Sequence, residues 1–387
     1  QTVHASDFSE LRVSSPVQIN DNVVENTYVM GEVHVISNAE DNSTLSLDGG
    51  LSVENNDCTP VDRETYDERP FNSINHRAQV LAMDNATISV NMPVKISTNS
   101  GYDICLFKDV DASDNATICA AIPVCVEYNA VTGSIGAHYN LVAQSGNATV
   151  HATGDILVRH NDVGYDQVDH DSPMIIVNVN LRAECSGPQQ ACEVVYDADA
   201  TITENDVSAS PELSTVAGIA ISPSVVAISA HDLPESSGSS QAKAVFGNVL
   251  VTKNSISIDA ASAANPYGIY LDSDVGAYSD RGLQACAEMG SAIIENNEVW
   301  ISGSRGWGIN VYSDSLRAEA VGEGSISTAV AGPHLIRDNL IEMECEHGYG
   351  IMVEAMDDNY ARAYDGAVAE FCMTSGTEIS GNHVSMD

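Results

Sequence analysis

The chain has 387 residues and carries 55 acidic side chains against only 15 basic ones, so its formal charge at pH 7 is −40. A surface with so few Lys and Arg lacks the basic patch that neutralises phosphates, which excludes a nucleic-acid partner and disfavours an anionic membrane surface. No apolar run approaches the roughly 18 residues that a membrane span needs, so we expect no membrane insertion.

The chain begins with Gln1 instead of Met, as a segment does after an N-terminal piece has been removed, and we interpret it as a mature secreted chain. Residues 1–16 lie outside the repeat described below and are expected to form an N-terminal extension, either a cap or an arm donated to a neighbour. Nine cysteines and four Asn-x-Thr sequons favour an oxidising compartment. We therefore expect an extracellular or cell-surface protein.

One pattern repeats through residues 17–387: an apolar residue, two others, Asn, any residue and then a second apolar position. It reads VRHNDVGY from Val158 and IENNEVWI from Ile294, and its later asparagines are spaced by 44, 49, 43, 42 and 43 residues. Amides that turn inward at equivalent corners can stack and hydrogen-bond to one another, so the pattern predicts a ladder of structural asparagines. The ladder consists of Asn161, Asn205, Asn254, Asn297, Asn339 and Asn382, and it extends back through Asn56, Asn99 and Asn129.

The coils within residues 17–165 also share a sequon. Asn42, Asn85, Asn115 and Asn147 each precede a ladder asparagine by 14 residues. They are expected at one equivalent exposed turn, where N-linked glycans would form a stripe along one face. Asp-Asn and Gly-Asn are also good turn residues, so the same pattern can arise without glycosylation.

The longer coils of residues 166–387 carry a second motif after the asparagine: GIAI at Gly218, GIYL at Gly268, GINV at Gly308 and GIMV at Gly350. Each is predicted to open a strand after a tight corner. The alternating segment that follows surrounds a Gly-containing turn and is interpreted as a β-hairpin inserted in the coil. Two disulfides are expected, one between Cys185 and Cys192 across a short loop and one between Cys105 and Cys119 across a hairpin.

Ile-x-x-Asn-x-Val-x-Ile followed by Gly-Ile-x-Val resembles the parallel-β-helix repeat of the pectin-lyase-like superfamily. The resemblance runs from about Val17 to the end of the chain. It implies an all-β fold, a right-handed parallel β-helix, here with a hairpin in most coils. The motif is specific for the fold and poor for function, because this superfamily includes polysaccharide lyases and hydrolases, phage tailspikes, surface adhesins and passenger domains.

Acidic residues follow the Gly-Ile strands, and enzymes of this superfamily place acids, and in the lyases a basic residue and Ca²⁺, on one exposed face. Asp274 and Asp314 both lie six residues after their glycine and are expected to stack. With Asp272 they form a candidate Ca²⁺ site; the alternative is a solvated acidic edge. The catalytic set of polygalacturonases is absent as a set, so we expect no enzyme and no cofactor other than Ca²⁺. Trp300 and Trp307 share a coil and can stack on a sugar, unless one of them is buried.

The sequence ends at ISGNHVSMD, within a repeat, so either more chain follows or another subunit completes the open end. These features predict a non-enzymatic extracellular structural protein: a self-assembling fibre subunit or a surface adhesin, glycosylated along one face. Its expected partners are further copies of itself, end to end or side by side, and glycans. The alternatives are a polysaccharide lyase or hydrolase, and a glycan-binding module of the tailspike kind.

Overall fold

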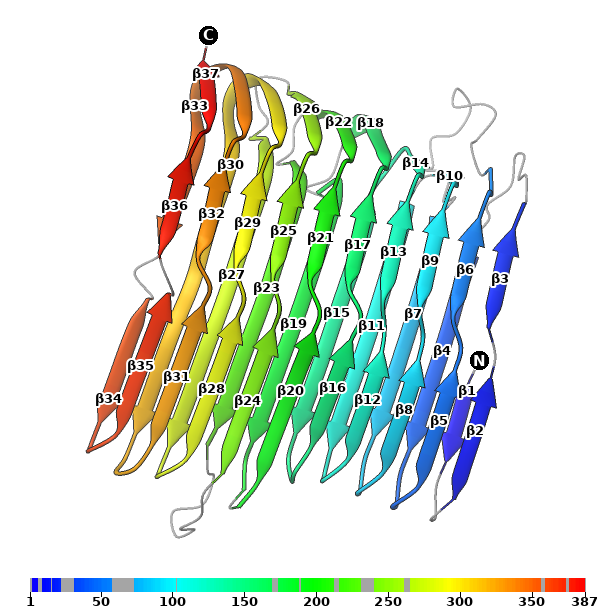
Figure 1. Cartoon of the computed structure of the whole chain (residues 1–387), viewed down its shortest axis with the longest axis vertical. Coiled ribbons are helices and arrows are strands. Elements are labelled where there is room, and N and C mark those ends of the chain that lie inside the picture. The colour runs from blue at the N-terminus through cyan, green and yellow to red at the C-terminus, as the bar shows by residue number, and fades with distance from the viewer. Residues whose placement is uncertain are drawn as a thin grey trace.

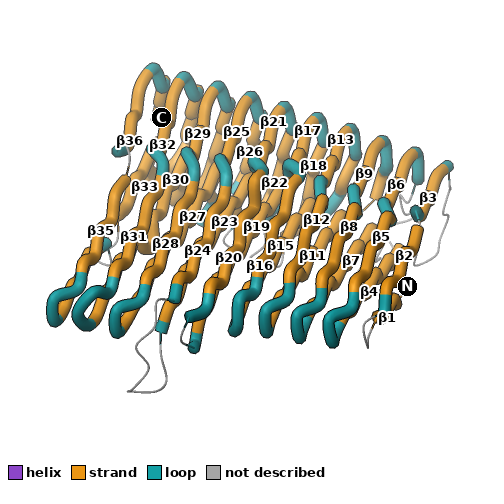
Figure 2. Tube along the Cα trace, turned by 60° about the horizontal axis from the view of Figure 1, so that its bottom comes forward, coloured by secondary structure: helices purple, strands orange, loops and turns teal. Residues whose placement is uncertain are grey.

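Alternation of apolar and polar residues makes strands of almost the whole chain. In β19 (Ile175–Cys185) every second side chain is buried and the others reach solvent, as expected for a strand with one face on a core. The computed structural model describes residues 2–5, 9–14, 16–21, 31–57, 73–101, 103–168, 173–187, 189–211, 216–230, 240–260, 265–355, 359–373 and 376–386. The described residues form strands and turns and contain no helix (Figure 2).

The strands lie in three sheets, A, B and C, and every pairing between described strands is parallel (Figure 1). Besides β19, sheet A holds β1 (Thr2–Ala5), β4 (Gly31–Ala39), β7 (Ser73–Ala82), β10 (Ser100–Gly101), β11 (Asp103–Ser113), β14 (Ala130–Val131), β15 (Ile135–Gln144), β18 (Asp162–Val168), β22 (Asp206–Pro211), β23 (Ala217–Ser229), β26 (Ser255–Asp259), β27 (Tyr267–Asp280), β30 (Glu298–Val321), β33 (Leu340–Ala355), β34 (Tyr360–Tyr364) and β37 (His383–Met386). Sheet B holds β2 (Glu10–Ser14), β5 (Thr44–Asp48), β8 (Thr87–Asn91), β12 (Thr117–Ala121), β16 (Thr149–Thr153), β20 (Ala191–Asp197), β24 (Gln241–Phe246), β28 (Gln284–Met289), β31 (Ile326–Ala331) and β35 (Val368–Met373). Sheet C holds β3 (Val17–Asn20), β6 (Leu51–Glu54), β9 (Val94–Ser97), β13 (Val124–Glu127), β17 (Ile156–Arg159), β21 (Ala200–Thr203), β25 (Val249–Thr252), β29 (Ala292–Glu295), β32 (His334–Arg337) and β36 (Thr377–Ser380).

One coil passes through all three sheets before the next coil begins. The chain runs along β19 in sheet A, turns into β20 in sheet B, turns again into β21 in sheet C, and returns to sheet A at β22. Each strand pairs with its counterparts in the neighbouring coils; β19, for example, pairs with β15 and β23. The fold is therefore an all-β parallel β-helix, as predicted, with the N-terminal and C-terminal coils at opposite ends of the stack (Figure 1).

The expected hairpin insertions are wrong. The two arms of each supposed hairpin, such as β19 and β20, belong to different sheets and pair in parallel with the coils before and after them. The segment is an integral part of a large coil, and its turn is the corner between sheets A and B. Alternation with a central turn fits both arrangements, because it does not specify the partner of either strand.

The predicted extension at residues 1–16 is also wrong where the structure describes it. β1 pairs in parallel with β4, and β2 pairs in parallel with β5. These strands belong to the first coil, so the N-terminal residues extend the solenoid instead of leaving it.

The predicted asparagine ladder is confirmed. From Asn56 to Asn382, the side-chain Nδ2 of each ladder asparagine donates to Oδ1 of the next, at 2.8 to 3.0 Å. The same Oδ1 accepts the backbone N–H of the preceding rung, as Asn205 does from Asn161 at 3.0 Å. The residue before each rung has a left-handed backbone, with φ of 53° to 58° at eight non-glycine positions. Such a backbone costs roughly 1–2 kcal/mol per residue, which the ladder's hydrogen bonds offset.

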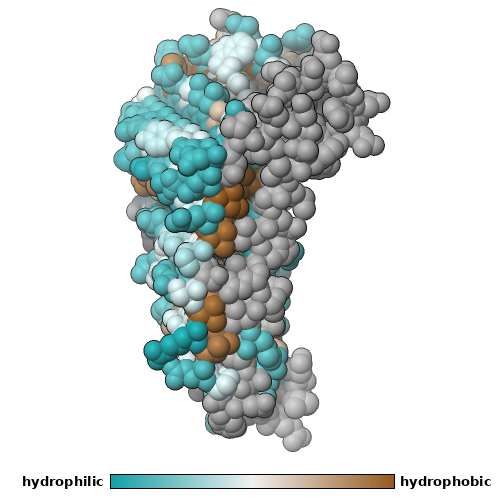
Figure 3. Space-filling view, turned by 90° about the vertical axis from the view of Figure 1, so that its right-hand side faces the viewer, coloured by the Kyte–Doolittle hydropathy of each residue, from teal (hydrophilic) through white to brown (hydrophobic). Residues whose placement is uncertain are grey.

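The core is a set of apolar columns that run through the stack. Within it Tyr139, Tyr196 and Phe246 form a stack on three successive coils, with ring centroids 5.5 and 5.8 Å apart. Figure 3 faces the end where β2 and β3 lie and shows apolar side chains at the surface among hydrophilic ones. The partly buried apolar residues of that coil are Leu11, Val13, Val17 and Ile19.

The core also encloses a basic side chain. Lys108 is 1% exposed, and its Nζ donates to the carbonyl oxygen of Met92 at a long 3.4 Å. Burial lowers the pKa of Lys108 from its ordinary 10.5 to about 7. This lysine is a cost to the fold, because its charged form has lost most of its solvation.

Replacing a ladder rung should destabilise the solenoid strongly. Asn205→Ala leaves the buried backbone N–H of Asn161 without its acceptor, which costs roughly 1–3 kcal/mol. It also removes the hydrogen bonds that Asn205 Nδ2 donates to the carbonyl oxygens of Val158 and Thr203, so we expect a total loss of about 2–4 kcal/mol. Urea unfolding followed by circular dichroism measures it. Asn178→Ala, on the outer face of β19, is the control and should lose much less; equal losses would contradict the ladder's role.

Lys108→Met should stabilise the protein and flatten its pH dependence. Between pH 7 and 10.5 the unfolded chain holds the Lys108 proton and the folded chain does not, so wild-type stability rises with pH there, by at most about 1.4 kcal/mol per pH unit. Below pH 7 both states are protonated and the full penalty applies. Unfolding free energies at pH 6.5, 8 and 9.5 check this; a variant that is less stable than wild type at pH 6.5 would refute it.

Candidate functional site

Aromatic side chains gather on the outside of the C-terminal coils. Seven of the 14 tyrosines and both tryptophans lie between residues 267 and 364. The two described tyrosines of the core, Tyr139 and Tyr196, come from earlier coils. The aromatic side chains of residues 267–364 all reach solvent in part, so they belong to a surface and not to the core.

The centre of this surface is a stack on sheet A, which we call the aromatic stack: Tyr267, Trp307 and Tyr349. The rings of Tyr267 and Trp307 are 4.7 Å apart with planes 17° from parallel, and those of Trp307 and Tyr349 are 6.4 Å apart with planes 19° from parallel. Tyr270 meets Tyr267 at 5.4 Å in a tilted arrangement. Tyr349 is 57% exposed, which leaves a ring at the end of the stack open to a ligand.

A glycine places each aromatic ring on the outer face. The stack residues immediately precede Gly268, Gly308 and Gly350, where the next coil and the core leave no room for a side chain. A Cβ on Gly308 would lie 2.4 Å from the carbonyl oxygen of Gly350 and 2.5 Å from Cγ2 of Ile341, so no other residue fits. Gly308 and Ile309 are both buried, which interrupts the alternation within β30, so the residues before and after them, Trp307 and Asn310, both face outward.

Polar groups border the aromatic stack. Tyr312 pairs in register with Asp272 on one side and with Glu354 on the other, which forms a row of carboxylate, phenol and carboxylate across three coils. Asn310 pairs in register with Tyr270 and Met352; it is 5% exposed, and its Oδ1 finds no hydrogen-bond partner among the described residues. Flat apolar rings beside hydrogen-bonding oxygens are the combination that binds sugar rings, whose faces are apolar and whose edges carry hydroxyls.

The structure brings the expected acidic residues together only in part. Asp272 and Asp274 both face outward from β27, but Asp274 pairs with Ser315 and not with Asp314. The register shifts between the pairs of Asp272 and Asp274, which breaks the equal spacing that predicted a stack. Asp314 lies in β30, and its side chain is outside the described residues. Among the residues the structure does describe, no three His, Cys, Asp or Glu side chains are grouped to hold a metal, and the Ca²⁺ site stays a prediction.

The two tryptophans have different surroundings. Both are half-buried on outer faces, so neither is a buried core residue, which was the alternative to a sugar-binding pair. Trp307 belongs to the aromatic stack, whereas Trp300 pairs in register with Ser257 and Glu342. The sequence does contain the signal for the stack: an aromatic residue stands directly before Gly-Ile in three successive coils, at Tyr267, Trp307 and Tyr349.

The four sequon asparagines are all exposed, at the corner between sheets A and B. In the first three, Asp and Asn both adopt left-handed backbone conformations, as Asp84 and Asn85 do with φ of 53° and 65°. In the fourth, Ser145 and Gly146 take those conformations, and Asn147 follows and donates from its Nδ2 to Oδ1 of Asn115 at 2.9 Å. The corner geometry thus explains Asp-Asn without a glycan, and glycosylation stays a prediction.

The two expected cysteine pairs have different outcomes. Cys185 and Cys192 are both buried, and the backbone N–H of Cys192 donates to Sγ of Cys185 at 3.0 Å. The hydrogen bond to the Cys185 thiol, together with burial, raises the pKa of Cys192. Both thiols are free in this structure. The Cys105–Cys119 pair is wrong, because Cys105 lies on the outer face of sheet A and Cys119 on the outer face of sheet B, with the core between them.

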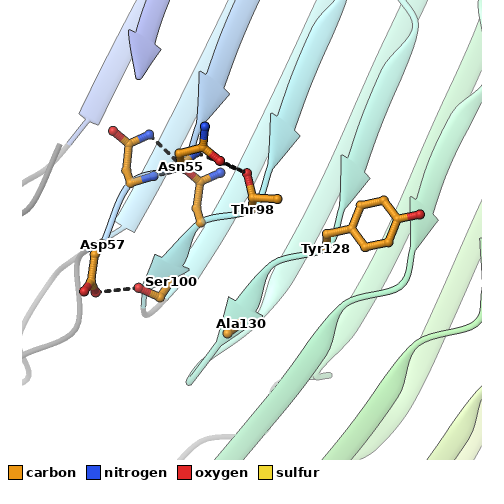
Figure 4. A pocket seen from close by; sticks show the side chains of 8 residues that line it. Asn55, Asp57, Thr98, Ser100, Tyr128 and Ala130 are labelled. Carbon is orange, nitrogen blue, oxygen red and sulfur yellow. Dashed lines mark hydrogen bonds between the residues drawn. The ribbon is translucent and has the colours of Figure 1, made fainter. Parts of the chain in front are cut away.

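A second candidate site lies at the ladder corner of the N-terminal coils (Figure 4). It is a shallow pocket of about 430 Å³ lined by polar residues. Its groups already bind one another: Ser100 Oγ donates to Asp57 Oδ1 at 2.6 Å, and Thr98 donates to Asn55. The ring of Tyr128 points away from these groups in Figure 4 and stacks on His160 at 4.8 Å. The pocket is therefore less suited to a ligand than the aromatic stack.

Comparison with known proteins identifies no relative: the chain matches no protein-family model, no curated protein and no solved structure. The described residues contain no helix that is long and apolar enough to cross a membrane.

Oxidation should join Cys185 to Cys192, because their thiols already meet across a short loop. After incubation with oxidised glutathione, alkylation in denaturant and peptide mapping should find these two cysteines linked and unmodified. Cys105 and Cys119 are the control and should be found alkylated or joined to glutathione, but not joined to each other. Alkylation of Cys185 and Cys192 after the same treatment, with no reductant added, would contradict the prediction.

Proposed function

We propose that this chain is an extracellular, non-enzymatic surface adhesin that binds a polysaccharide on the outer face of sheet A. The observation that carries the proposal is the aromatic stack of Tyr267, Trp307 and Tyr349, bordered by Asp272, Tyr312 and Glu354 in register. The membership in the pectin-lyase-like superfamily that the repeat suggests is part of the proposal, and it is consistent with the β-helix.

The charge of the chain restricts the ligand. With 55 acidic and 15 basic residues, and with Asp272 and Glu354 beside the rings, a polyanionic glycan would be repelled. The proposed ligand is therefore a neutral or amine-bearing polysaccharide. Its sugar rings would pack against the outward edges of the stacked rings and on the open face of Tyr349, and its hydroxyls would donate to the carboxylates.

A rigid scaffold suits this role. Parallel pairing in three sheets and the asparagine ladder fix the relative positions of Tyr267, Trp307 and Tyr349 before any ligand arrives, which lowers the entropy cost of binding. Self-assembly into fibres and glycosylation at the sequons are compatible with an adhesin and stay predictions.

Hydrolysis is the second candidate function, because Asp272 and Asp274 share the outer face of β27 beside the stack. Two carboxyl groups that flank a glycosidic bond are what such catalysis requires. A hydrolase releases reducing ends from the bound polysaccharide, and Asp272→Asn or Asp274→Asn would abolish that release. An adhesin binds without turnover.

Trp307→Ala should reduce polysaccharide binding by about tenfold or more, since loss of an aromatic contact is worth on the order of 1 kcal/mol beyond the buried area. Calorimetry with cello-, chito-, xylo- and manno-hexaose, and with a chitosan hexamer, measures it. Polygalacturonate is the anionic comparison and should not bind. Trp300→Ala is the matched control, because Trp300 lies on an outer face outside the stack. Wild-type protein that binds none of these glycans, or equal effects of the two substitutions, would refute the proposal.

A further inference from the structure

Asn310 is an exception among the buried asparagines. The others that are buried in the described part of the chain all belong to the ladder, where each side chain has several hydrogen bonds. Asn310 is buried to the same degree, yet its Oδ1 has no partner among the described residues. A buried carbonyl without a donor is a liability that a fold normally avoids.

The fold does not require an asparagine at this position. The same register position holds Ile176 and Ala220 in earlier coils, and Tyr270 and Met352 in the coils on either side of Asn310. An apolar side chain is therefore compatible with the backbone here. The polar group of Asn310 must be explained by something other than the packing of sheet A.

The position of Asn310 near the aromatic stack suggests why this residue is polar. Asn310 faces outward between Ile309 and Val311, whose side chains both point into the core, and it stands three residues after Trp307 of the aromatic stack. Only 5% of it is exposed there. One of its two neighbours in register is Met352, an unbranched and adaptable side chain that is itself partly exposed and can move aside.

We infer that Asn310 determines specificity in the polysaccharide site, with its Oδ1 accepting a hydrogen bond from a hydroxyl or acetamido N–H of the bound glycan. This inference rests on the proposed function. The bound glycan supplies the donor that the described part of the chain does not provide, so binding removes a cost already present in the fold. A ligand without a donor at this place leaves the carbonyl unpaired and binds less tightly.

Asn310→Leu tests the inference, because it removes the acceptor with little change in volume. We expect its Kd for the hexaose that the wild-type protein binds best to rise at least tenfold, while its thermal unfolding temperature stays the same or increases. A merely structural asparagine would give the opposite pattern, with lower thermal stability and unchanged affinity. Asn310→Asp retains an oxygen acceptor and should bind more tightly than Asn310→Leu. Asn178→Leu, an outer-face asparagine of sheet A in another coil, is the matched control and should bind as wild type does.

The outcomes separate this inference from the proposed function. Loss of binding in Trp307→Ala with wild-type affinity in Asn310→Leu would overturn the role of Asn310 and leave the aromatic site standing. Unchanged affinity in both variants, or no binding by wild type, would overturn the site itself. Reduced affinity in Asn310→Leu accompanied by a lower unfolding temperature would also count against the inference, because a packing defect would then explain the loss.

Discussion

Every feature of this molecule depends on one constraint: each coil must pair in register with the coil before it and the coil after it. Backbone hydrogen bonds meet that requirement along the strands, and the asparagine ladder meets it at the corner where the chain leaves sheet C. An amide offers both a donor and an acceptor, so one rung serves two neighbouring coils at once. The side chains that face the core can consequently vary little from coil to coil. The differences between coils are found in the turns and on the outer faces.

The candidate site follows from that division. Gly268 and Gly308 are fixed by the close approach of the next coil, but the residue before each glycine is not, and it is Tyr267 or Trp307 here where an earlier coil has Ala217. In the same way Asn310 takes a register position that Ala220 occupies two coils earlier. The scaffold does not require these side chains, and at Asn310 it bears the cost of an unpaired carbonyl, which is the reason to propose a ligand for them.

The sequence was informative where a residue has one role that its neighbours cannot fill. The ladder asparagines are such residues, and their prediction agrees with the structure. The Gly-Ile motif stands at the start of a strand at Gly218 and Gly268, as predicted, but Gly308 and Gly350 lie inside the continuous strands β30 and β33, so that prediction is wrong for the last two copies. The alternation of apolar and polar residues shows only which side chains share a face. It therefore did not reveal that β19 and β20 pair with other coils and not with each other. The predicted Cys105–Cys119 disulfide was wrong for the same reason. The stack of Asp274 on Asp314 depended on equal spacing, which the register shift after Asp272 removes. The aromatic residue before Gly-Ile was visible, but its meaning required knowing that successive copies lie one strand apart.

The left-handed residue before each ladder asparagine gives the corner an unusual property. Its backbone conformation directs the side chain outward, while the asparagine that follows is directed inward. The positions are filled by an amide, a hydroxyl, an aromatic ring, an acid and a base, at Asn55, Thr98, Tyr128, Glu204 and Lys253 among others. Successive positions in this row lie about 4.8 Å apart, which is the distance between neighbouring coils. The chemical type of the side chain can therefore differ at every position of this row, while the scaffold that fixes the spacing stays the same.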